Sequence, residues 1–200
     1  PGGFIVPAAT APGEIVVNGM SPSKRNSPYA NSGLVVSVTE KDFSPHTGAL
    51  AGLAFQQQIE QAACRAAGGT QAAPAQRMTD FVGKRLSADL PKSSYHPGLS
   101  SVMLDDILPA AITLRLQEAL KIFGKKMKDY YTREAVLVGV ESRTSSPVRI
   151  PRDEESLQHP QLQGLFPCGE GAGYAGGIVS AAMDGERCAE ACGRYLTATY

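Results

Sequence analysis

The stretch that decides the fold covers residues 164–185 and reads GLFPCGEGAGYAGGIVSAAMDG. Its apolar beginning predicts a short buried strand, and an acidic residue, Glu170, follows. Six glycines fall within residues 164–177, after which the sequence becomes apolar and rich in alanine. We therefore predict a strand, a glycine-rich turn and a helix that runs from about Gly176 into the region of Arg194.

This turn suits the binding of an anion or of an electron-rich ring. Glycine lets a backbone approach a ligand closely, and the start of a helix offers unpaired N–H groups and the positive end of its dipole. The alternative is a tight turn between strand and helix that binds nothing. The density of glycines beside a carboxylate favours a ligand.

The composition excludes several classes of protein. The 200 residues are enough for one domain of good size or two small ones. Lys plus Arg equals Asp plus Glu, at 19 each, so no basic surface for nucleic acid is expected. No apolar run has the length of a membrane span. We expect no signal peptide, because the first residues show no charged region followed by an apolar core. Because residue 1 is proline, we expect the sequence to begin inside a longer gene product or to follow processing.

The cysteines predict reduced, partly buried thiols in a cytoplasmic protein. None of the four belongs to a Cys-x-x-Cys pair. Cys188 and Cys192 are four residues apart and would share a helix face, which makes a metal pair conceivable. No histidine is placed as an obvious partner, so we expect structural thiols and no metal.

Four apolar, β-branched segments predict strands, at residues 3–7, 14–20, 33–38 and 134–141. A polar loop at residues 21–32 separates the second segment from the third.

The middle of the chain predicts helices. Helical spacing covers residues 50–66 and stops at a pair of glycines. Residues 72–83 are expected to form a connector and residues 86–99 a loop. Ser101 would cap a short helix, and a longer one would start at Pro109 and end near Gly124.

A second candidate site follows the strand predicted at residues 134–141. The run Arg143, Thr144, Ser145 and Ser146 combines a guanidinium with three hydroxyl groups, which suits an anion or a polar ring edge. A capped turn with a surface ion pair explains the same residues equally well. Arg149 and Arg152 lie nearby and would suit an acidic substrate. The three histidines are expected to be exposed loop residues, and no residue is assigned a catalytic role.

The glycine-rich stretch resembles the C-terminal flavin motif of two-dinucleotide-type FAD oxidoreductases. More closely, the whole chain resembles an uncharacterised family of FAD-dependent, or NAD(FAD)-utilising, dehydrogenases. The matching pieces span nearly all 200 residues: PGG at 1–3, VNGMS at 17–21, YANS at 29–32, LAGLAFQ at 50–56, ESRTSSPV at 141–148 and the glycine-rich run.

One departure from that family matters. Such proteins open with a strand and a Gly-x-Gly-x-x-Gly turn that holds the FAD pyrophosphate, and no such pattern occurs near this N-terminus. The resemblance therefore implies the C-terminal portion of a longer flavoprotein. Its missing N-terminal dinucleotide-binding half would hold the ADP part of the cofactor.

The implied fold belongs to the α/β class and is α+β in this stretch. It is a partial FAD/NAD(P)-binding Rossmann-like domain with an inserted, largely helical unit that covers the substrate. Residues 1–42 would supply β-strands of the FAD-binding region and residues 43–133 the inserted unit. Residues 134–200 would form the C-terminal FAD-binding strand, turn and helix.

The resemblance also implies roles. Glu170 would hydrogen-bond the ribityl chain or act through water near the pyrophosphate. The helix start would face the pyrimidine edge of the flavin and stabilise its anionic reduced form. Tyr174 would pack on the ring or be an ordinary tyrosine. The implied cofactor-binding residues are Gly169, Glu170, Gly171, Gly173, Tyr174, Ala175, Gly176, Gly177 and Ile178, together with Arg143, Thr144 and Ser145.

The implied function is that of an FAD-dependent dehydrogenase, with NAD(P)H as the donor that the family name suggests. We expect these 200 residues alone to bind flavin weakly or not at all. Two alternatives stay open: a non-catalytic ligand-binding or scaffold module, and another nucleotide enzyme. The absence of Lys-Ser/Thr after the turn argues against phosphoryl transfer. The expected partners are the missing half and a small substrate, without nucleic acid or membrane.

Overall fold

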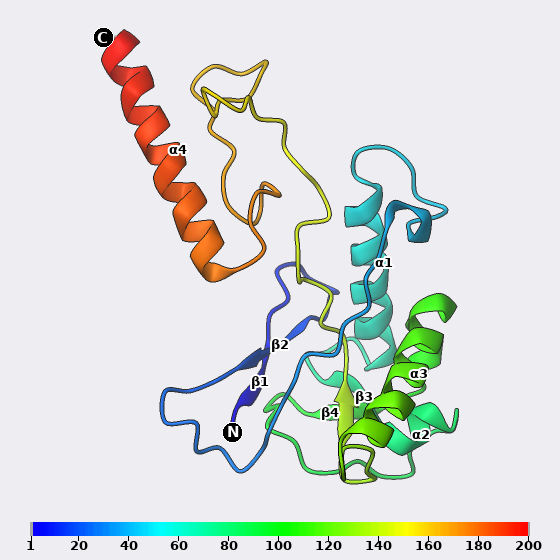
Figure 1. Ribbon diagram of the computed structural model, residues 1–200. Coiled ribbons are helices and arrows are strands. Elements are labelled where there is room, and N and C mark those ends of the chain that lie inside the picture. Colours follow the sequence, from blue (N-terminus) through cyan, green and yellow to red (C-terminus); the bar gives the residue numbers. More distant parts are fainter. Residues whose placement is uncertain (1, 200) are drawn as a thin grey trace. The chain divides into compact units, whose positions relative to one another are not determined.

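The computed structural model describes residues 2–199 (Figure 1), so Pro1 of the PGG piece and Tyr200 lie outside the described residues. The chain forms two compact units. The first comprises Pro1–Asp42 and Gln56–Ser142, and the second comprises Phe43–Phe55 and Arg143–Tyr200. Helices accompany two small sheets, so the fold is α+β, as predicted for this stretch.

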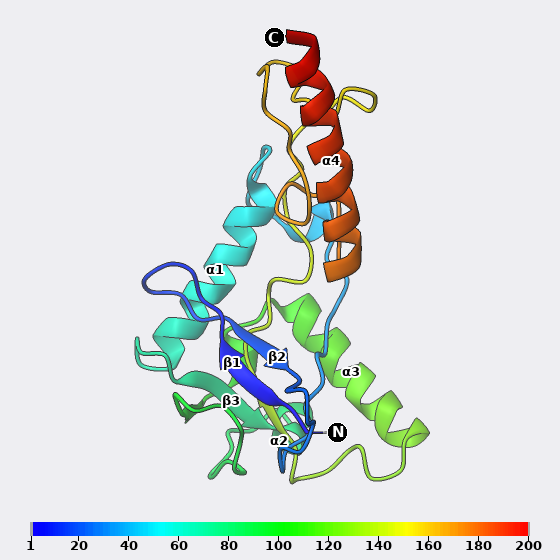
Figure 2. The same ribbon diagram turned by 90° about the vertical axis from the view of Figure 1, so that its left-hand side faces the viewer.

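The first unit contains a β-hairpin. Strands β1 (Phe4–Pro7) and β2 (Val17–Met20) pair antiparallel (Figure 2, blue arrows). The loop after β2 folds back on the chain start, where the Gly3 amide donates to the Tyr29 carbonyl at 2.9 Å. The strand predicted at residues 33–38 is wrong. That segment pairs with no strand, and Val35 is 58% exposed, so β-branched residues alone did not make a strand there.

A three-stranded sheet also belongs to the first unit. Strand β3 (Ala73–Arg77) is central, parallel to β4 (Leu99–Ser101) and antiparallel to β5 (Val136–Val138). The connector predicted at residues 72–83 is therefore wrong. Helix α2 (Met78–Val82) follows β3 directly. Strand β3 contains a proline and no β-branched residue, so its sequence gave no strand signal.

The helices of the first unit match the prediction more closely. Helix α1 (Ala51–Ala66) crosses the unit boundary and is followed by Gly68 and Gly69, both with positive φ, as expected of a helix stop. Helix α3 (Ala110–Lys126) begins after Pro109 but continues through Gly124. A Cβ at Gly124 would lie 2.6 Å from the Cβ of Tyr131, so close packing explains this glycine.

Two short 3-10 helices complete the first unit: η1 (Glu40–Asp42) and η2 (Leu104–Asp106). Ser101 was predicted to cap the helix at η2, which is wrong, because its hydroxyl donates to the Ser87 carbonyl at 2.7 Å and Met103 precedes the helix. The side chains of Phe81 and Leu120 are fully buried and form part of the core of this unit.

The second unit has one long helix of its own, α4 (Ile178–Thr199), and a long irregular segment before it. The predicted helix is confirmed, whereas the strand predicted before Gly169 is absent. The Leu165 carbonyl accepts the His159 amide and the Pro167 carbonyl accepts the Arg152 side chain, so local partners replace a strand ladder. A small core joins Leu157 to α4.

None of the helices described here is both long and apolar enough to cross a lipid bilayer.

Candidate functional site

The glycine-rich turn lies wholly in the second unit and leads directly into α4. Gly169 and Gly173 have φ values of +70° and +83°, in the left-handed region that favours glycine. The Gly169 carbonyl accepts the Tyr174 amide at 3.0 Å, and the Glu170 carbonyl accepts the Gly173 amide at 2.9 Å. A Cβ at Gly173 would lie 2.8 Å from the Val148 carbonyl oxygen. The first half of the turn is therefore closed by hydrogen bonds and close packing.

The second half of the turn is open. A Cβ at Gly176 would meet no atom within 4 Å, and the same holds for Gly171 inside the closed half. Among the described residues, no group accepts a hydrogen bond from the amides of residues 175–177. The first amides of a helix lack intrahelical partners, and the Ala181 amide already reaches back to the Gly177 carbonyl. The turn and the helix start thus present several free N–H donors together.

A buried ion pair supports the turn from α4. Arg152 and Asp184 form a two-pronged pair, with N–O distances of 3.0 and 2.9 Å, and each side chain is 7% exposed. The same Asp184 accepts the Gly169 amide at 2.9 Å. The Arg152 guanidinium also donates to the Pro167 carbonyl at 2.9 Å and lies 3.1 Å from the Cys188 sulfur. One ion pair therefore connects α4, the irregular segment and the turn.

This environment shifts the pKa values of both partners. The hydrogen bond from Arg152 holds the pKa of Asp184 below its ordinary value, and the same bond raises the pKa of Arg152. Burial raises the pKa of the Cys188 thiol. Both groups of the pair are thus kept charged, and Arg152 is bonded inside the fold rather than presented to an acidic substrate.

Tyr174 packs against arginine side chains. The guanidinium carbon of Arg152 lies 3.6 Å from the ring centroid, and that of Arg149 lies 4.4 Å from it. The tyrosine hydroxyl donates to the Ile150 carbonyl at 2.8 Å. Such cation–π contacts are favourable, so this side chain joins the turn to residues 149–152.

The second candidate segment lies in the same unit as the turn. Arg143 is half-buried, while Thr144 and Ser145 are exposed. The neighbouring Ser146, which was not among the predicted cofactor-binding residues, donates to the Val148 carbonyl at 2.8 Å and lies 3.2 Å from that of Gly171. The sequence signal for Ser146 was its place in the same run of hydroxyl residues.

Asp184 was also missed by the sequence analysis. It shares one face of α4 with two buried apolar positions, Cys188 and Ala191. An aspartate on an otherwise apolar helix face indicates a buried charge partner, and this was the signal available.

Three of the family-like sequence pieces meet inside the first unit. The side chain of Asn31 lies against Gly3 and Gly19, where an added Cβ would come within 2.7 and 3.1 Å of its amide atoms. Its Nδ2 atom is buried and has no hydrogen-bond partner among the described residues. The two glycines are therefore required by close approach of the asparagine.

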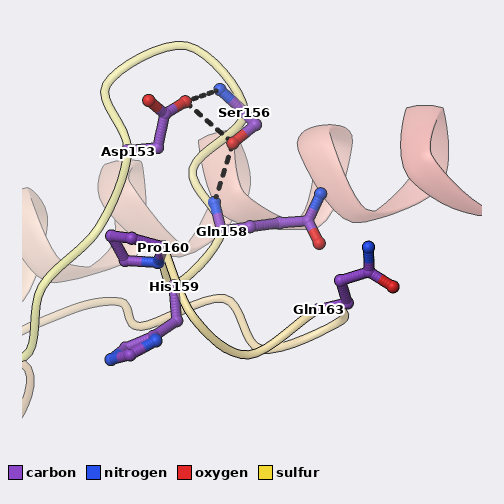
Figure 3. Close-up of a pocket in the computed structure, with 6 residues that line it drawn as sticks. All are labelled: Asp153, Ser156, Gln158, His159, Pro160 and Gln163. Atoms are coloured by element: carbon purple, nitrogen blue, oxygen red, sulfur yellow. Dashed lines mark hydrogen bonds between the residues drawn. The ribbon is translucent and has the colours of Figure 1, made fainter.

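A cavity of about 380 Å³ lies in the irregular segment before the turn (Figure 3) and is lined by Asp153, Ser156, Gln158, His159, Pro160 and Gln163. Asp153 accepts hydrogen bonds from the amide and the hydroxyl of Ser156, both at 2.8 Å. The His159 ring accepts the Gln161 amide at 3.1 Å. These polar groups are used within the loop, and none of the predicted site residues lines the cavity.

The four cysteines are free thiols. Cys64 and Cys188 are buried, Cys192 is half-buried and Cys168 is exposed. Within the described residues, no three side chains of the metal-binding types gather at one place.

Comparison with known proteins places the chain in a family. The family model described as "FAD-dependent protein, C-terminal domain-like" matches residues 1–144, which include the whole first unit but stop before the glycine-rich turn. An uncharacterized protein of Clostridium beijerinckii is 43% identical over 192 residues. The match covers 95% of this chain but 36% of that relative, so the chain spans about a third of its length. The chain belongs to the family of FAD-dependent proteins, C-terminal domain-like.

Proposed function

We propose that the chain is the C-terminal portion of an FAD-dependent oxidoreductase of the dehydrogenase type. In this proposal, residues 169–178 hold the isoalloxazine end of the flavin. The observation that carries it is the group of free amides and open glycine faces at the start of α4. Family membership supports FAD as the ligand.

The residues present fit such a ring. The pyrimidine edge of a flavin accepts hydrogen bonds, and amide donors with the positive end of a helix dipole complement it. Because Gly171 and Gly176 carry no side chain and face open space, a flat ring can approach the backbone. The bound cofactor would supply the electron transfer itself.

The individual side chains have narrower proposed roles. The exposed carboxylate of Glu170 would bind a ribityl hydroxyl. Arg143, Thr144 and Ser145 would bind a second polar part of the ligand. Tyr174 would support the turn, since guanidinium groups already pack on its ring.

Other parts of the proposal rest on the family resemblance. A dinucleotide-binding portion outside these 200 residues would hold the ADP half of FAD, and NAD(P)H would donate electrons. Residues 1–42 and 134–200 would contribute to the FAD-binding part, and residues 43–133 would cover the substrate. A cytoplasmic location is proposed on the cysteine content.

Glycine-to-valine substitution in the full-length gene product tests the flavin site. We expect flavin absorbance in the purified wild type, and flavin affinity lowered roughly tenfold or more in Gly176→Val, because the new side chain would fill the space of the ligand. The fold should survive, since a Cβ at this position meets no protein atom. Gly193→Val is the matched control, since it is equally open and lies far along α4.

A colourless but folded wild type would overturn the cofactor proposal and favour a non-catalytic module. Unchanged flavin binding in Gly176→Val would place the ring elsewhere. Titration of FAD into the 200-residue chain should show weak binding or none, and tight binding would contradict the proposed need for a second half.

A further inference from the structure

We propose that Arg152 and Asp184 are positioning residues for the proposed flavin site, and that their ion pair fixes the glycine-rich turn at the start of α4. The inference rests on the proposed function, because it concerns the same turn. Neither residue is among those that the family resemblance assigns to the cofactor.

The pair holds the two peptide groups on either side of Cys168. Arg152 binds the carbonyl before this residue, that of Pro167, and Asp184 binds the amide after it, that of Gly169, both at 2.9 Å. The chain therefore enters the turn at one defined place and direction. The Gly169 carbonyl accepts the Tyr174 amide. The position of Gly169 therefore also fixes that of Tyr174, the last residue of the closed half of the turn.

The pair is itself rigidly placed. Its two parallel N–H to oxygen bonds fix the plane of the guanidinium, and the ring of Tyr174 stacks at 3.6 Å. Both side chains are 7% exposed, so water competes little for these bonds. Asp184 is carried by the helix whose first amides are the proposed donors. The pair thus aligns the turn with the donors beside it.

A pair that fixes the turn beside a bound ring also acts on that ring electrostatically, whereas a pair that stabilises the fold far from the ring does not. The intact pair has no net charge. Asp184→Asn leaves the guanidinium unpaired, which would stabilise an anionic reduced flavin and raise its reduction potential. Arg152→Met leaves the carboxylate unpaired and would lower the potential. General loosening of the fold predicts no such opposite signs.

The first experiment needs no flavin. Hydrogen exchange of the 200-residue chain should be faster at the hydrogen-bonded amides of Gly169, Gly173 and Tyr174 in Asp184→Asn, by about tenfold for each 1.4 kcal/mol of lost protection. Arg152→Lys should show a smaller effect, since it retains the charge but loses the two-pronged geometry. Glu190→Gln is the control, because its pair with Arg194 on the same helix is 66% exposed and 4.0 Å long. Exchange equal to wild type in Asp184→Asn would overturn the inference.

The second experiment measures the reduction potential of the flavin in the full-length gene product. Opposite shifts in Asp184→Asn and Arg152→Met are expected, with no shift in Glu190→Gln. Unchanged potentials in both variants would overturn the positioning role. A full-length product without flavin would refute the proposed function instead, while the exchange experiment would still decide whether the pair fixes the turn.

Discussion

Each of the two units of this protein is stabilised internally by a different kind of contact. The first unit surrounds a three-stranded sheet with apolar side chains, and Phe81, Ile15 and Leu120 are fully buried. The second unit has a small apolar cluster around Leu157 and depends on a buried ion pair beside it. The segment with the proposed binding turn is therefore ordered largely by polar contacts.

Apolar and polar support respond to different perturbations. Burial of apolar surface is non-directional and scales with area. A buried ion pair defines geometry, but its net contribution to stability is small, while the loss of one partner is costly. We therefore expect truncation of side chains to damage the first unit most, and changes in charge or pH to damage the second.

The largest effect is expected from Phe81→Ala. The side chain is fully buried in the first unit, so truncation should lower the free energy of unfolding by about 4 kcal/mol. Urea denaturation followed by circular dichroism measures this loss. Leu114→Ala on α3 is the control, since that side chain is 57% exposed. Parallel loss of amide protection in α4 would show that the two units unfold together. It would contradict the view that each unit depends on its own kind of contact.

Arg152→Met should have the next largest effect, confined to the second unit. It leaves Asp184 buried without its partner, which costs about 3 kcal/mol. Hydrogen exchange should show lost protection along α4 and unchanged protection in β3. Arg194→Met, in the exposed pair on α4, should change stability by less than about 0.5 kcal/mol. Equal effects of the two substitutions would remove the special role of the buried pair.

Acidification should destabilise the second unit before the first, with a smaller effect on stability than Arg152→Met. Hydrogen bonds from Arg152 and Arg85 lower the pKa values of Asp184 and Asp80, respectively. A carboxyl group whose pKa is lower in the folded state stabilises the fold above its unfolded pKa, which is about 3.9. That contribution disappears as the pH falls through the folded pKa. Arg85 is 64% exposed, so its pair is the more solvated of the two.

We therefore expect α4 to lose protection first as the pH is lowered from 5 towards 2, with the sheet of the first unit following later. Exchange measured along this pH series tests the order. Asp184→Asn should abolish the acid-dependent step in α4, because no group at that position then titrates. Simultaneous loss in both units would contradict this.

Much of the helical structure could be predicted from the sequence. Helices α1, α3 and α4 carry apolar residues at helical spacing, and glycine or proline lies near their ends. Strand β3 could not be predicted, because Ala73–Arg77 has no β-branched residue and includes a proline; its strand character comes from pairing on both sides. Tertiary context overrides local propensity in such cases.

The place of the glycine-rich turn could also be predicted, but not the contacts that hold it. The pairing of Arg152 with Asp184 spans 32 residues, most of them irregular, and no local spacing relates such positions. The run of hydroxyl residues that includes Ser146 could be predicted, but the bond from Ser146 to the Val148 carbonyl could not. The division into FAD-binding and inserted parts, and the assignment of cofactor-binding residues, stay predictions.

The smallest expected effect concerns a buried polar group of the first unit that makes no hydrogen bond within the described residues. The hydroxyl of Thr79 in α2 is buried and has no hydrogen-bond partner among the described residues. Because an unsatisfied buried hydroxyl is costly, Thr79→Val should raise the free energy of unfolding by about 1 kcal/mol, less a few tenths for the poorer helix propensity of valine. The urea midpoint measures the change, with an unaltered m-value as the sign of an intact fold.

Thr113→Val in α3 is the matched control for this substitution. Thr113 is also buried in a helix of the first unit, but its hydroxyl lies 3.5 Å from the Leu108 carbonyl, to which it donates. Its replacement should be neutral or destabilising, so the two variants should differ in sign. If both destabilise the chain equally, the Thr79 hydroxyl is satisfied by water. In that event a buried hydroxyl of α2 would also contribute to the stability of the first unit, and the contrast with the unit that holds Asp184 would be one of degree.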